Sequence, residues 1–212
     1  MGLFDIFHRP APIRDAAELA DFIDQQAAFV AQKGIYEYAR ARAGHYSKVL
    51  FKEAQFQAAC EVSRWRAFPL GLAMVGELTE GILLPAWRKD RPALVDAMRA
   101  LVLAVFDRYP MPEALNAQIW ATLRADLDQR LRHIGLHPPK WAKDIPEPLS
   151  ELYFDLMPIH EKLRGRDAPT LHSYLRVTMV NVHDQLTKRL DVPAMIGALE
   201  AAPGTPEAVL AR

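Results

Sequence analysis

Two similar phrases in the sequence each place a histidine beside a carboxylate: His160-Glu161 in PIHEKL and His183-Asp184 in NVHDQL. Imidazole nitrogens and carboxylate oxygens bind divalent cations, so these groups could hold a metal if two neighbouring helices brought them together. Adjacent helix residues point about 100° apart, however, and the His-Glu-x-x-His and Glu-x-x-His spacings are missing. We therefore favour histidines that pack between helices, and we assign no metal, no cofactor and no catalytic residue.

Nucleophiles and phosphate-binding loops give no stronger indication of catalysis. None of the four serines stands in a G-x-S-x-G turn, and Ser-x-x-Lys is absent. Glycines 71, 76 and 81 are spaced five apart, which matches neither a dinucleotide fingerprint nor a P-loop. Cys60, the only cysteine, lies in a helical-looking stretch and is expected to be a small buried side chain. Whether the protein is an enzyme stays open, with the motifs favouring a protein that is not.

A third candidate lies in the proline-rich stretch 136–148, where Lys140 and Lys143 flank Trp141. A tryptophan between two cations on an irregular segment suits contact with a protein or with a lipid headgroup. The alternative is that Trp141 plugs the segment onto its own domain. Together with Arg132, these residues form the predicted partner-binding surface.

The elements that would position these residues are all helical. Apolar residues recur at three- and four-residue steps, and Asp15 with Glu18 has the form of a capping pair. Glycines and prolines divide the pattern, with Gly34, Pro69 and Pro112 as expected helix boundaries. The expected helices cover residues 15–34, 35–43, 48–67, 69–84, 92–109, 112–135, 148–164 and 169–190, with a last short helix from 193.

This pattern predicts an all-α fold with a single globular domain of seven to eight helices over residues 15–202. Residues 1–14 are expected to form an arm and 203–212 a tail. The chain has 212 residues, with 26 basic and 26 acidic side chains. A formal net charge of zero gives no field toward a phosphate backbone, so we expect no nucleic-acid partner. No segment is expected to span a membrane, although apolar residues of the arm could touch its surface.

Residues 126–163 carry a resemblance to a known family. Asp128, Leu131, Arg132 and Gly135 match a D-x-x-L-R-x-x-G helix, and Pro139, Lys140 and Lys143 match the basic connection that follows it. The Tyr153-Phe154 pair matches an aromatic pair in reversed order. On these residues the chain resembles the ubiquinol–cytochrome c chaperones. The connection is longer than in that family, and His160 stands near a position that is usually tyrosine.

The resemblance implies an all-α, non-catalytic assembly factor that binds a membrane protein subunit, cytochrome b. It would act in the cytoplasm, peripheral to the inner face of the membrane. Two other functions stay open. One is a helical enzyme or carrier with a site between helices for an apolar small molecule, such as a quinone or lipid, with or without a metal. The other is a structural or regulatory module whose histidines and aromatic residues only pack.

Overall fold

The computed structural model describes residues 11–201, and the expected tail at 203–212 and most of the expected arm lie outside this range. The described residues form helices and no sheet, which confirms the all-α prediction. Residues 11–201 contain seven α-helices of six or more residues and two of four residues each. In chain order the α-helices are α1 (Ala16–Ala43), α2 (Ser47–Leu50), α3 (Ala54–Leu83), α4 (Arg91–Asp107), α5 (Ala117–His133), α6 (Ser150–Asp155), α7 (Glu161–Arg164), α8 (Ala168–Arg189) and α9 (Val192–Ala201).

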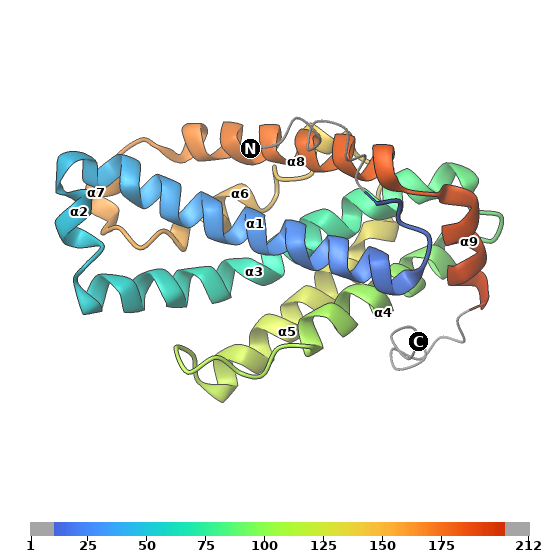
Figure 1. Ribbon diagram of the computed structural model, residues 1–212, viewed down its shortest axis with the longest axis horizontal. Coiled ribbons are helices and arrows are strands. Elements are labelled where there is room, and N and C mark those ends of the chain that lie inside the picture. Colours follow the sequence, from blue (N-terminus) through green and yellow to red (C-terminus); the bar gives the residue numbers. More distant parts are fainter. Residues whose placement is uncertain (1–10, 202–212) are drawn as a thin grey trace, which may run out of the picture.

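Three long helices define the shape of the molecule (Figure 1). Helices α1, α3 and α8 run along its long axis, and α4 and α5 form a pair that packs obliquely against α3. Helix α3 has a continuous buried run from residue 67 to 76, because it contacts α1, α4, α5 and α8. A helical stretch that is apolar on all sides has to be covered on all sides, and here the surrounding helices cover it.

Helix ends follow local capping chemistry. The Asp15 side chain accepts a hydrogen bond from the backbone N–H of Glu18, as the sequence predicts, and Asp90 and Asn116 cap α4 and α5 in the same way. The expected start of α5 at Pro112 is therefore wrong. Helix α1 ends at Gly44, whose φ of 52° lies in the left-handed region that glycine adopts without strain.

Two predicted helix boundaries are absent, because the helices run straight through them. Helix α1 continues past Gly34, and α3 continues past Pro69. A proline inside a helix removes one hydrogen bond and costs about 3 kcal/mol. Pro69 lies within the buried run of α3, so the burial of the residues on both sides of it outweighs that cost.

The predicted helix at 148–164 is also wrong as one element. It divides into α6 and α7, separated by residues 156–160. Pro158 cannot donate a backbone hydrogen bond, which favours a break at this point. The division leaves Tyr153 fully buried, while His160 stands just outside α7.

No membrane span was expected, yet one helix among the described residues is long and apolar enough for one. Residues Ala54–Ala86 are long and apolar enough for a span, but 78% of the most apolar window is buried inside the protein. Two glutamates in this helix, Glu77 and Glu80, form ion pairs with cations from other segments. Helix α3 is thus the central core helix of this fold.

Part of the expected arm packs on the domain. Ile13 is fully buried and exchanges backbone hydrogen bonds with the end of α8 and the chain just after it, donating to the carbonyl of Arg189 and accepting from the N–H of Asp191. The four apolar residues of the arm that could touch a membrane surface, at positions 3, 4, 6 and 7, lie outside the described residues.

Candidate binding surface

The two histidine–carboxylate phrases make local contacts. The Nδ1 atom of His160 accepts from the N–H of Lys162 at 3.3 Å and so caps α7, and Asp184 forms an ion pair with Lys188 at 2.7 Å on α8. Within residues 11–201, no group of three or more histidine, cysteine, aspartate or glutamate side chains is close enough to bind a metal. Glu161 and His183 therefore have no assigned role.

Cys60 is buried, as expected for a small packing side chain. Burial, with a smaller effect from Glu61, raises the pKa of the Cys60 thiol to about 11. At neutral pH the group is therefore a thiol, and the thiolate is the form that acts as a nucleophile.

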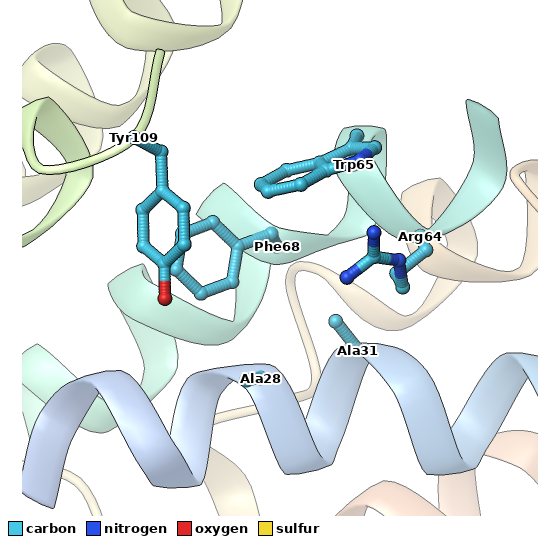
Figure 2. A pocket seen from close by; sticks show the side chains of 6 residues that line it. All are labelled: Ala28, Ala31, Arg64, Trp65, Phe68 and Tyr109. Atoms are coloured by element: carbon cyan, nitrogen blue, oxygen red, sulfur yellow. The ribbon is translucent and has the colours of Figure 1, made fainter. Parts of the chain in front are cut away.

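An aromatic pocket lies between α1 and α3 (Figure 2). Trp65, Phe68 and Tyr109 pack edge to face around a cavity of about 30 Å³, beside Arg64. The Tyr109 hydroxyl donates to Asp24 at 2.7 Å, and burial together with this bond raises the Tyr109 pKa to about 12. A cavity of this size holds about one water molecule, so it is too small for a quinone or a lipid chain.

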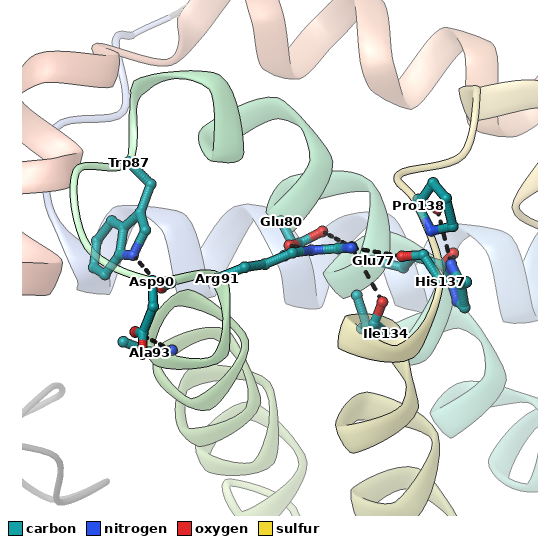
Figure 3. A network of polar contacts seen from close by, with 9 residues as sticks. All are labelled: Glu77, Glu80, Trp87, Asp90, Arg91, Ala93, Ile134, His137 and Pro138. Atoms are coloured by element: carbon teal, nitrogen blue, oxygen red, sulfur yellow. Dashed lines mark hydrogen bonds and ion pairs between the residues drawn. The ribbon is translucent and has the colours of Figure 1, made fainter.

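A polar network fixes the start of the proline-rich stretch 136–148, which we call the proline-rich connection (Figure 3). The Glu80 carboxylate, on α3, is 1% exposed and accepts two hydrogen bonds from Arg91, at 2.8 and 3.2 Å. The bond to Glu80 raises the pKa of the Arg91 guanidinium. The same guanidinium donates to the carbonyl oxygens of Ile134 and His137. One arginine thus joins α3, α4 and the chain that follows α5.

Further contacts hold the connection on both sides of Trp141. The Nζ atom of Lys140 lies 2.8 Å from Glu77, Asp144 forms an ion pair with Arg176 on α8 at 3.5 Å, and Ile145 is buried. Segment 140–145 is therefore tied to α3 at one end and to α8 at the other.

Trp141 itself is 78% exposed, so it does not plug the connection onto the domain. That alternative from the sequence is wrong. Lys143 is exposed as well, and the nearby Leu136 is as exposed as the tryptophan. We call Leu136, Trp141 and Lys143 the connection surface.

The four residues of the predicted partner-binding surface divide into two pairs. Trp141 and Lys143 are exposed, and Lys143 forms no ion pair with a described residue. Lys140 and Arg132 instead have ion-pair partners within the chain: Glu77 for Lys140 and Asp128 for Arg132, at 2.8 Å each. Glu77, Glu80 and Arg91 were not predicted as part of the site. The sequence did contain a signal for them: Glu77 and Glu80 lie in an apolar helix, and buried carboxylates need cations from elsewhere in the fold.

Asp128 and Arg132 belong to the motif that carries the family resemblance, and they form a structural cluster with Arg99. Burial acts to raise the pKa of Asp128, but hydrogen bonds from Arg99 and Arg132 outweigh it and lower the pKa below its usual value. A carboxylate whose pKa is lowered in the folded state stabilises the fold above its unfolded pKa, and this contribution is lost as the pH falls through the folded pKa.

We accordingly expect Asp128→Asn to be less stable than wild type at pH 7. The difference should shrink as the pH falls through the acid range, because both chains then carry a neutral group at this position. Urea unfolding at several pH values measures it. A constant difference across that range would show that Asp128 acts through packing instead.

In comparisons with known proteins, no family model, curated protein or solved structure matches the chain. The fold and the geometry therefore define a class only: a helical domain that holds an exposed tryptophan and lysine on an anchored, proline-rich connection.

Proposed function

We propose that the protein is a non-catalytic binding or assembly factor that contacts a partner protein through the connection surface. The observation that carries the proposal is the exposure of Trp141 on a segment held by ion pairs on both sides. A large aromatic side chain gains much free energy when a partner buries it. Because the surrounding backbone is already fixed, little conformational entropy is lost on binding.

The proposed partner is a membrane protein subunit, and the resemblance of residues 126–163 to ubiquinol–cytochrome c chaperones suggests cytochrome b. Lys143 gives the surface a positive charge beside Trp141, which suits the acidic side chains or phosphates found at a membrane face. Arg132 and Lys140 support the surface through their internal ion pairs and are not proposed as direct contacts.

The proposal predicts that Trp141→Ala with Lys143→Glu strongly reduces capture of cytochrome b from detergent-solubilised native membranes. Loss of a buried tryptophan at an interface costs about 2 kcal/mol or more, a weakening of roughly 30-fold. Tyr46→Ala is the matched control, because Tyr46 is a 57% exposed aromatic residue on a different segment. Quantitative immunoblotting of the captured material gives the comparison.

Equal capture by Trp141→Ala/Lys143→Glu and by Tyr46→Ala would show that the connection surface is not the contact. Lys140→Glu is a poor test, since it would place a second carboxylate beside Glu77 and release the connection from α3. Both proposed changes are at exposed side chains, so the variants are expected to fold.

A further inference from the structure

A second candidate surface is a groove between α3, α5 and α6. It is an open cleft of about 110 Å³, and its apolar wall is formed by aliphatic side chains and one proline: Pro69, Leu70, Leu123, Leu127, Leu152 and Leu156. Leu152 is 44% exposed, so the apolar wall extends to the protein surface. None of these residues belongs to the connection surface.

Charged groups line the same groove without partners. Arg66 and Arg130 form neither an ion pair nor a side-chain hydrogen bond with any described residue, and the same holds for Asp126. Several other guanidinium groups of the fold do form ion pairs, such as Arg91 with Glu80 and Arg124 with Asp107. The groove thus combines an apolar wall with two cations and one anion that remain available.

We propose that this groove binds an acidic amphipathic segment of a partner protein. One apolar side chain of the segment enters the cleft, and neighbouring carboxylates pair with Arg66 and Arg130. An enclosed cavity of about 150 Å³ holds a benzene molecule, so about 110 Å³ matches a single aliphatic side chain. The excess of positive charge selects carboxylates over ammonium groups.

The size of the cleft favours a protein segment over a free amphiphile. A small ligand confined to this volume has few atoms and gains little binding free energy. A helical segment can insert one side chain and also lie along the exposed side of α5, where Asp126 and Arg130 stand one turn apart. The Asp126 carboxylate would repel a segment that places an acidic side chain next to it, and this repulsion adds to specificity.

The test uses two synthetic helical peptides of about 18 residues, long enough to hold a helix in water. Both carry leucines at positions i, i+3, i+4 and i+7; one has glutamates beside them and the other has lysines. Fluorescence anisotropy measures their binding to the full chain at low and high salt. The acidic peptide is expected to bind at least about tenfold more tightly than the basic one.

Variants assign the binding to the groove. Arg66→Glu and Arg130→Glu should each weaken the acidic peptide about tenfold, and Leu152→Glu should weaken it as well. Arg166→Glu is the matched control, since it makes the same charge change at an exposed arginine without an ion pair among the described residues. Thermal unfolding of each variant verifies that it is folded.

The proposal is wrong if the two peptides bind equally, or if Arg66→Glu has no more effect than Arg166→Glu. Displacement of the peptide by an equal concentration of octanoate would instead identify a site for free amphiphiles, which also overturns it. Trp141→Ala is expected to keep full peptide binding, so the outcome is separate from that for the connection surface.

Discussion

Replacement of Arg91 by alanine should lower the free energy of unfolding by about 3–5 kcal/mol, the range found when one partner of a buried ion pair is removed. The Glu80 carboxylate, which is 1% exposed in the folded protein, would lose the cation that compensates its charge. The carbonyl oxygens of Ile134 and His137 would lose a charged donor in the same step. Urea unfolding followed by circular dichroism measures the loss.

The chain contains a matched control for this change. Arg124 also forms two hydrogen bonds to one carboxylate, that of Asp107, but both side chains are nearly half exposed. Arg124→Ala should cost less than about 1 kcal/mol, because water replaces the lost partner. Similar losses for Arg91→Ala and Arg124→Ala would mean that burial of Glu80 does not decide the energetics.

Arg91 also has a local effect that distinguishes it from a purely global stabiliser. Its guanidinium binds the carbonyl oxygens of Ile134 and His137, on either side of Leu136 in the connection surface. Arg91→Ala should therefore speed amide hydrogen exchange in residues 136–145 at low denaturant, before global unfolding contributes. The exposed Trp141 would then lie on a less fixed segment, and its contribution to partner binding should fall.

The helical class and several helix ends could be predicted from the sequence, because both depend on residues close together in the chain. The apolar three- and four-residue steps need only local periodicity, and the Asp15 cap needs only the N–H three residues later. The single-domain all-α fold followed from the same pattern.

The parts of the site that were not predicted depend on partners far apart in the sequence. The role of Glu80 was not predicted, since its cation is supplied by the next helix. The internal pairing of Lys140 with Glu77 was missed for the same reason. Periodicity also could not decide whether Trp141 faces the domain or solvent, because irregular chain has no fixed period.

The sequence marks Gly34 as a structurally important glycine, but the structure gives a different reason for its importance. It was expected to end a helix, yet α1 continues through it without a left-handed φ. A Cβ atom at this position would lie 2.3 Å from the Tyr153 hydroxyl oxygen. That hydroxyl donates to the carbonyl of Val30 at 2.7 Å, and burial raises the pKa of the phenol. Glycine is required here by the close approach of a buried tyrosine.

We expect Gly34→Ala to destabilise the protein by about 1–3 kcal/mol, the cost of overpacking a filled core. In an open helical position the same change stabilises by about 0.5–1 kcal/mol, because alanine loses less conformational entropy than glycine. Gly197 in α9 provides that position, since a Cβ atom there meets nothing within 4 Å. Opposite signs for Gly34→Ala and Gly197→Ala, measured by urea unfolding, would separate steric conflict from helix propensity.

A double-mutant cycle identifies the atom responsible. Tyr153→Phe alone should cost about 1 kcal/mol for the lost hydrogen bond. In the Tyr153→Phe background, the penalty of Gly34→Ala should fall by about 1 kcal/mol or more, since the nearest atom is gone while ring carbons remain at 3.1 and 3.3 Å. Additive losses would place the conflict elsewhere. A coupling of the expected sign would show that α6 can pack this closely on α1 only because Gly34 has no side chain. This packing fixes the end of the proline-rich connection relative to the core.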